Sequence, residues 1–242
     1  MTEKKSPKSV LQMVMMGLLV VAAFAIGSMW TELRMLKGGK GVQQEAAGEV
    51  PGEPEEITEL TEDQWQELLV DPAYASGEEG VGVTIVELTD YQCPFCKRHV
   101  DEVGGQIEDE YISTGKVRYM FRDLPLSFHQ NAHLAAQAAR CAGDQGQYWG
   151  YHDKLFETQA LWGEVKAESL FKGYAGELGL NQGEFDGCLD EGKYKQAVDD
   201  DLVLAAKVGA SGTPTFFING KKLVGAQPWA AFQTMIDEAL GE

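Results

Sequence analysis

Cysteine, histidine and basic residues are all scarce in this chain of 242 residues. It holds 4 cysteines, 4 histidines, and 20 lysines and arginines against 38 aspartates and glutamates, for a formal net charge of −18. Residues 1–50 carry six basic and four acidic side chains, so the remainder of the chain has a net charge of −20. An acidic body repels phosphate backbones, which argues against nucleic acid as a partner.

The small number of cysteines also limits metal binding. Cys93 and Cys96 form a single C-x-x-C motif, whereas a structural zinc site needs two further ligands at suitable spacing. Lys97 stands where covalent haem attachment requires histidine. His129 and His133 are four residues apart without a third ligand nearby, so we interpret them as capping or packing residues. We expect no metal, and the cysteine pair is either a structural disulfide or a redox-active one.

Charged residues are absent from Val10 to Trp30, a run of 21 residues that is long enough to cross a bilayer as a helix. A removable signal peptide is the alternative, with cleavage after Ala23-Phe24-Ala25. The apolar run continues past that point, so we favour an uncleaved anchor: a cytoplasmic stub and transmembrane helix over residues 1–37. Glycine, glutamate and proline dominate residues 38–56, which predicts a flexible linker. The expected location is the cell membrane, single-pass, with the body on the extracytoplasmic side.

Residues 57–242 are predicted to form an α/β domain. The apolar run 81–88 predicts a buried strand, helical spacing follows the cysteines, and residues 116–124 predict a second strand. Helical patterns then fill an insertion over about 129–207. The segments 213–220 and 221–226 predict two strands joined by a turn at Asn219-Gly220, and a helix beginning near Pro228 closes the chain.

Two motifs together carry a resemblance to a known family. C-P-F-C follows a strand that ends near Glu87, and S-G-T-P-T-F-F-I-N-G stands near the end of the chain. Residues 78–242 thereby resemble the DsbA-like branch of the thioredoxin superfamily, in its membrane-anchored bacterial type. The resemblance implies a thioredoxin-like fold with an inserted helical domain. It also implies a thiol:disulfide oxidoreductase with no cofactor beyond the redox-active disulfide Cys93–Cys96.

The position of the motif predicts different roles for the two thiols. Cys93 follows a strand and begins a helix, where unpaired N–H groups lower the pKa of a thiol. We expect Cys93 to be the exposed nucleophile and Cys96, one turn later, to be the resolving thiol. Pro94 suits the first turn of a helix because it lacks an N–H. Phe95 stands where some family members have a histidine that stabilises the thiolate.

The resemblance assigns three further residues to the site. It implies that Pro214 is cis and faces the dithiol, and that Thr213 offers its backbone to an extended substrate, beside Pro94 and Phe95. It also implies a buried acid at Glu87 that exchanges a proton with Cys96. The alternative is that Glu87 is a charge emerging at the edge of the strand.

The remaining cysteines, Cys141 and Cys188, lie in two predicted helices of the insertion. An exported chain rarely leaves two thiols idle, so we expect a disulfide that closes a loop of about 48 residues. Two buried free thiols are the alternative.

These observations predict an exported, membrane-tethered oxidoreductase that donates disulfides to translocated proteins. Its partners would be reduced or unfolded exported proteins and, by family analogy, a quinone-linked membrane reoxidase of the DsbB or vitamin K epoxide reductase type. A reductase or isomerase of the same fold is the alternative. A non-catalytic membrane-anchored interaction module is a third hypothesis, and reactivity at Cys93 distinguishes it from both enzymes.

Overall fold

The computed structural model describes residues 58–242. The predicted anchor and linker lie outside the described residues. Within residues 58–242, no helix combines the length and the apolar character that a membrane crossing requires.

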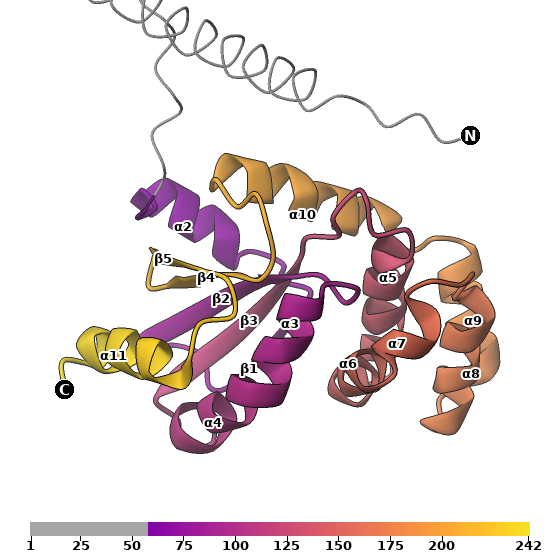
Figure 1. The fold of residues 1–242 in the computed structure, drawn as a ribbon, viewed down its shortest axis with the longest axis horizontal. Helices are drawn as coiled ribbons and strands as arrows, with labels where there is room; N and C mark the ends of the chain where they lie inside the picture. The colour runs from indigo at the N-terminus through magenta and orange to yellow at the C-terminus, as the bar shows by residue number, and fades with distance from the viewer. Residues whose placement is uncertain (1–57) are drawn as a thin grey trace, which may run out of the picture. The chain divides into compact units, whose positions relative to one another are not determined.

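A five-stranded mixed sheet forms the centre of the domain (Figure 1). Its strands are β1 (Tyr74–Ser76), β2 (Val83–Thr89), β3 (Val117–Asp123), β4 (Thr215–Ile218) and β5 (Lys221–Val224), in the spatial order β1-β3-β2-β4-β5. The central strands β2 and β3 are parallel, and every other neighbouring pair is antiparallel. This is the α/β class that the sequence predicts.

Helices cover both faces of this sheet and form the insertion beside it (Figure 1). They are α2 (Glu62–Leu69), α3 (Pro94–His99), α4 (Gly105–Ile107), α5 (Ala132–Gly143), α6 (Tyr148–Glu157), α7 (Gln159–Trp162), α8 (Glu168–Glu177), α9 (Gln182–Asp190), α10 (Lys195–Lys207) and α11 (Trp229–Leu240). Helices α5 to α10 stand between β3 and β4 in the chain, so the predicted helical insertion is confirmed.

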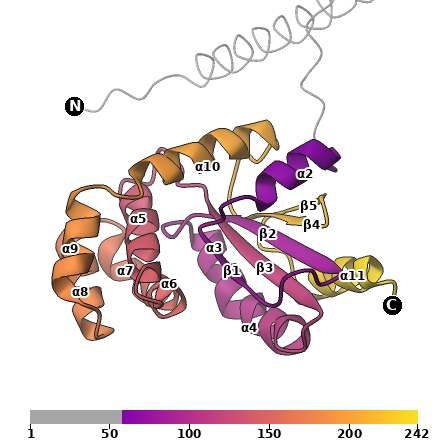
Figure 2. The same ribbon diagram turned by 180° about the vertical axis from the view of Figure 1, so that it is seen from behind.

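Strand β2 is buried on both faces, as its unbroken apolar sequence predicts. Side chains on one face, such as Ile85, pack with α3, α11 and the insertion, whereas those on the other face, such as Val86, pack with α2 and α10. The view from behind shows α2 and α10 next to each other on one side of the sheet, with α4 and α11 on the other side (Figure 2). The sheet is therefore the middle layer of three.

Short-range signals explain the local structure at both ends of the domain. Thr61 caps α2 through a capping box with Gln64, which satisfies the free N–H groups of the first turn. Asn219 and Gly220 both adopt positive φ, at 46° and 86°, and turn the chain from β4 into β5. The predicted hairpin is confirmed.

Three details differ from the sequence prediction. The helical stretch after Cys93 alternates α-helix with two π-helical turns, at Val100–Gly104 and Glu108–Ile112, around a glycine pair of low helix propensity. Pro228 is the cap before α11 rather than its first residue. Strand β1 was not predicted, because three residues are too few to establish a period.

A buried ionic cluster ties the insertion to the sheet. Arg122 and Asp123 end β3, Arg140 belongs to α5 and Asp201 to α10. Asp201 accepts hydrogen bonds from Arg122 at 2.6 Å and from Arg140 at 2.5 Å, and Arg140 also bonds Asp123 at 2.5 Å. All four side chains are at most 7% exposed, so each charge depends on the others for compensation.

Candidate active site

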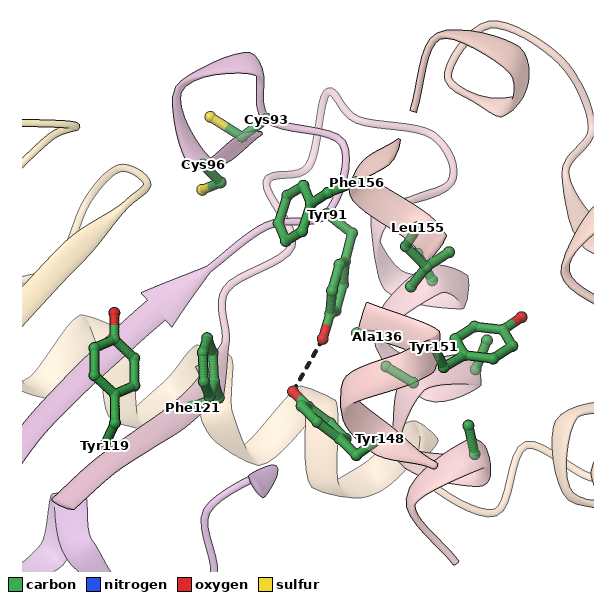
Figure 3. Close-up of a cluster of buried hydrophobic side chains, with 14 of the residues drawn as sticks. Tyr91, Cys93, Cys96, Tyr119, Phe121, Ala136, Tyr148, Tyr151, Leu155 and Phe156 are labelled. Carbon is green, nitrogen blue, oxygen red and sulfur yellow. Dashed lines mark hydrogen bonds between the residues drawn. The ribbon is translucent and has the colours of Figure 1, made fainter. Parts of the chain in front are cut away.

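The two cysteines of the C-P-F-C motif lie where β2 leads into α3. Cys93 is the N-cap of α3 with extended backbone, at φ −74° and ψ 124°, and Pro94 takes the first helical position. Cys96 follows one turn later on the inner side of the helix, as Figure 3 shows. The N-terminus of α3 therefore presents its free N–H groups to the sulfur of Cys93.

Hydrogen-bond donors favour the thiolate form of Cys93. The Cys96 thiol and the backbone N–H groups of Phe95 and Cys96 lower the pKa of Cys93 to about 6, although burial acts in the opposite direction. In its neutral form the Cys93 thiol donates to the carbonyl oxygen of Thr213 at 3.4 Å. The expectation that Cys93 is exposed is wrong, because it is only 3% exposed beside this loop.

Cys96 has the opposite character. It is fully buried, and burial raises its pKa well above the usual value, as does its hydrogen bond to Cys93. The backbone N–H of Asp90 points to its sulfur at 3.4 Å. Cys93 and Cys96 are present as thiols, and their acidities differ in the direction required for one nucleophile and one resolving thiol.

The loop that precedes β4 faces the dithiol. The Thr213-Pro214 peptide bond is cis, and Pro214 is buried while Thr213 is partly exposed. The carbonyl of Thr213 is the group that contacts Cys93. An extended peptide that reaches Cys93 must therefore pass this backbone.

Glu87 lies deep in the sheet rather than at its edge. It is 1% exposed, and burial raises the pKa of its carboxyl to about 7. The Tyr119 hydroxyl donates to Glu87 Oε2 at 2.8 Å and lies 3.3 Å from His99 Nε2. The negative charge of Glu87 adds to the raised pKa of Cys96, and the negative charge of Cys93 adds to the raised pKa of Glu87, so the carboxyl and the dithiol interact electrostatically.

Polar side chains from the insertion fix the loop before Cys93. Gln159 donates to the carbonyls of Tyr91 and Cys93 at 2.8 and 3.1 Å. Asp90 binds His129 at 2.7 Å, and the Tyr91 hydroxyl donates to that of Tyr148 at 2.9 Å (Figure 3). The insertion thus directly positions the turn that carries Cys93.

The histidines of the i, i+4 pair have separate partners. His129 binds Asp90, whereas His133 binds Asp199 at 2.9 Å. Among residues 58–242, no group of three or more histidine, cysteine, aspartate or glutamate side chains is arranged to hold a metal ion.

Large apolar side chains are exposed on segments that adjoin the dithiol. Phe95 lies within the motif and is 54% exposed, and Phe128 precedes His129 and is 75% exposed. Leu161 and Val165 are exposed around Gly163, whose carbonyl accepts from Gln92 at 2.8 Å. Exposed apolar side chains that flank a reactive group are typical of a surface that binds other proteins.

The second cysteine pair is a disulfide within the insertion. Cys141 of α5 and Cys188 of α9 are joined, with their Cα atoms 5.9 Å apart and a sequence separation of 47. The bond lies in a different part of the domain from the thiols, which leaves Cys93 and Cys96 as the pair available for exchange.

Sequence reasoning missed Tyr119, His99 and Gln159. Tyr119 and His99 carry no motif, and Gln159 acts across 66 residues on the backbone of Cys93. Tyr119 could have been found only from the pairing of the strands, because the parallel register of β3 against β2 places Tyr119 on the same face as Glu87. That register is a property of the folded sheet rather than of either segment alone.

Comparison with known proteins agrees with this geometry. The family model described as Thioredoxin matches residues 71–238. The chain is 27% identical over 172 residues to disulfide bond formation protein D of Bacillus subtilis, covering 68% of this chain and 75% of that protein. The crystal structure of Wolbachia pipientis alpha-DsbA1 superimposes with a TM-score of 0.66 at 25% identity, covering 74% of this chain and 96% of that one.

A second kind of relative is much longer. The Na(+)/H(+) antiporter NhaA 1 of Salinispora arenicola is 35% identical over 173 residues, which is 70% of this chain. The chain spans about a quarter of the length of these antiporters.

Proposed function

This chain belongs to the thioredoxin family, and we propose that it is a DsbA-like thiol:disulfide oxidoreductase that donates the Cys93–Cys96 disulfide to reduced proteins outside the cytoplasm. The opposite acidities of the two thiols carry the proposal. Cys93 has a pKa of about 6 and is a good leaving group, while Cys96 is buried with a raised pKa. Stabilising the Cys93 thiolate stabilises the reduced form, which makes the disulfide a stronger oxidant.

The reaction proceeds in two exchanges. A client thiolate attacks Cys93 Sγ, the Cys93–Cys96 bond breaks, and Cys96 leaves as a thiolate that takes a proton from Glu87. A second client thiolate then attacks the client sulfur of the mixed disulfide, and Cys93 leaves as a thiolate. The client gains one disulfide and the enzyme retains two electrons as its dithiol.

Client recognition would use the features around Cys93. The carbonyl of Thr213 accepts from an extended client backbone, and Pro214 closes that side of the site. Pro94 and the exposed ring of Phe95 border the other side. Apolar contacts tolerate many sequences, which suits clients that are still unfolded.

The cellular setting follows from the sequence outside the described residues. An uncleaved helix at Val10–Trp30 would tether the domain to the membrane on its extracytoplasmic side. Reoxidation of the dithiol requires an acceptor of two electrons, and a quinone-linked membrane protein of the DsbB or vitamin K epoxide reductase type supplies one.

The decisive measurement is the redox potential of the Cys93–Cys96 pair. The purified full chain is equilibrated with glutathione buffers, and the Cys93 thiol is trapped at each ratio. We expect a potential above about −200 mV, on the oxidising side of glutaredoxins. A value near about −270 mV, as in thioredoxin, would instead support the reductase alternative.

Variants of the two cysteines separate an enzyme from an interaction module. Cys96→Ser should trap clients that already carry a disulfide: the Cys93 thiolate attacks that disulfide, one client thiolate leaves, and the mixed disulfide persists because the resolving thiol is missing. Cys93→Ser should trap none and should lose oxidase activity. Equal oxidation of a reduced test protein by wild type and Cys93→Ser would rule out catalysis by this pair.

A further inference from the structure

A cavity behind the dithiol is lined by two buried histidines, His99 and His152, that the proposed catalytic scheme leaves unused. It has a volume of about 580 Å³ and lies between β1, β3, the π-helical turns after α3, and α6. Neither cysteine lines it, nor do Thr213 and Pro214. In Figure 3 the two cysteines lie at the start of α3, and Tyr119 lies well below them along the sheet.

Three residues on the wall of this cavity have buried polar atoms without a hydrogen-bond partner: Glu87 Oε1, His99 Nδ1 and His152 Nε2. Each of these side chains is at most 2% exposed. Glu108 and Asp153 also line the cavity and are exposed, so solvent reaches it beside them. A buried polar atom without a partner lowers stability, so a cluster of three such atoms at one cavity indicates a function there.

Hydrogen bonds link two of these residues through a third. The Tyr119 hydroxyl donates to Glu87 Oε2 at 2.8 Å, so its oxygen is free to accept from His99 Nε2–H at 3.3 Å. This arrangement leaves His99 Nδ1 as an acceptor that a donor in the cavity can reach. Glu87, Tyr119 and His99 therefore form one continuous row from the buried carboxylate to the cavity.

The row can carry one proton by reversing the direction of its bonds. A proton arrives on His99 Nδ1, the Nε2 proton passes to Tyr119, and the Tyr119 proton passes to Glu87. Glu87 then donates to Tyr119 and Tyr119 donates to His99. Each bond that breaks is replaced by one that forms, and one proton has moved from the cavity to Glu87.

We propose that Tyr119 and His99 are a proton wire that loads Glu87 from this cavity while a client covers Cys93. The inference rests on the proposed function, in which Glu87 protonates the leaving thiolate of Cys96. A client bonded to Cys93 covers the side on which Thr213 lies, so a proton must reach Glu87 by another side. Burial lowers the pKa of His99 to about 3, which keeps its ring neutral and suits it to passing a proton rather than storing one.

Several titratable groups face the two ends of the wire. Around Glu87 they are Cys93 and Cys96 of α3, Tyr119 of β3, Tyr91 of the preceding loop and Tyr148 of α6. At the cavity end they are Glu108, His152 and Asp153, and His152 Nδ1 is held by Asp153 at 2.9 Å. Tyr119→Phe removes only the Tyr119 hydroxyl from this set, and a substitution of His99 leaves the whole set in place.

The test is the rate at which a dithiol peptide opens the Cys93–Cys96 disulfide of the full chain in a single turnover. Samples are quenched in acid and their thiols counted. Tyr119→Phe removes one hydroxyl and both bonds of the wire. Tyr151→Phe is the matched control, since it removes a buried hydroxyl that bonds Phe171 within the insertion.

We expect the disulfide of Tyr119→Phe to open about tenfold more slowly than that of wild type at pH 8 and at nearly the wild-type rate at pH 5.5. A tenfold loss is a part of the roughly 10²–10⁴-fold acceleration that is typical of acid–base catalysis. The direction of the rate change at pH 8 distinguishes the wire from a simple shift in the pKa of Glu87. Tyr119 stabilises the Glu87 carboxylate, so its loss alone would raise the pKa of Glu87 and leave more of it protonated at pH 8. That effect predicts a rate equal to or faster than that of Tyr151→Phe, and such a rate would overturn the wire.

His99→Ala provides an independent measurement. It opens space beside the cavity, and added imidazole should restore the rate at pH 8 with saturation, whereas thiophene, a five-membered ring without nitrogen, should not. Equal recovery with both compounds would show that His99 acts only in packing against Phe216 and Phe232. Glu87→Gln separates the proton wire from the role of Glu87. If Glu87→Gln opens its disulfide at the wild-type rate, Glu87 is not the proton donor. If Glu87→Gln is slow but Tyr119→Phe opens at the wild-type rate, Glu87 is the donor and the wire alone is refuted.

Discussion

The sulfur of Cys93 lies 3.4 Å from the carbonyl oxygen of Thr213, which comes 120 residues later in the chain. The contact joins the start of α3 to the loop before β4, so the whole helical insertion is enclosed between the two halves of the site. A client that reaches Cys93 must displace or share this carbonyl. Under the proposed function, chemistry and client recognition would meet at this one pair of atoms.

The acidity of Cys93 should depend chiefly on its partner thiol. We expect alkylation of reduced Cys93 by iodoacetamide to rise with pH around a midpoint near 6, because the thiolate is the reactive form. Cys96→Ala removes the largest cause of the lowered pKa and should move the midpoint upward. Cys96→Ser keeps a donor and should move it less. Equal midpoints in both variants would assign the effect to the helix terminus instead.

Glu87 should make stability depend on pH. Its pKa rises from 4.5 to about 7 on folding, so the folded state holds its proton more tightly than the unfolded state. The stabilisation is complete below pH 4.5 and is lost as pH rises through 7, by about 3 kcal/mol. Glu87→Gln should therefore be more stable than wild type at pH 8, with a flatter profile in denaturant titrations. Glu102→Gln, on an exposed residue, is the control and should retain the wild-type pH profile.

The ionic cluster should be sensitive to loss of a single member. Asp201→Asn leaves Arg122 and Arg140 with an uncompensated buried charge and should lower the free energy of unfolding by about 3–5 kcal/mol. The neighbouring Asp200 bonds only to Gln196 on the surface of α10, so Asp200→Asn should cost less than about 1 kcal/mol. Similar midpoints for the two variants in urea would show that the cluster adds nothing net.

The Cys141–Cys188 disulfide should stabilise the insertion. It closes a loop with a sequence separation of 47, for which chain entropy gives about 4 kcal/mol. The measurement uses a Cys93→Ser, Cys96→Ser double variant, in which this bond alone responds to reductant. The free energy of unfolding of this double variant should fall by about 4 kcal/mol when dithiothreitol is added. An unchanged value would mean that the reduced chain keeps the loop closed by packing.

Local chemistry made part of the site predictable. A C-x-x-C after a buried strand and an Asn-Gly turn are signals that act within a few residues, and β2, α3 and the β4–β5 hairpin lie where these signals place them. The insertion also follows from continuous helical spacing. The signals are strong because each conformation is fixed by neighbours in the chain.

Other features arise only when distant segments meet. The exposure of Cys93 was misjudged because the loop at Thr213 covers it, and no property of the motif itself reports that cover. The row from Glu87 to His99 depends on the register of β3 against β2 and on the path of α3 across the sheet. The sequence around Asp201 is a helix with several acidic residues and does not distinguish Asp201 from them. Only the fold places Asp201 between two arginines.

The disulfide in the insertion has a consequence for the supply of the protein. Each new copy emerges with four thiols, two of which must be joined before Cys141 and Cys188 hold α5 to α9. Under the proposed function, a nascent copy would itself be a client of the exchange that mature copies perform. Maturation would then accelerate as finished molecules accumulate, and a cell without any would depend on an outside oxidant to begin.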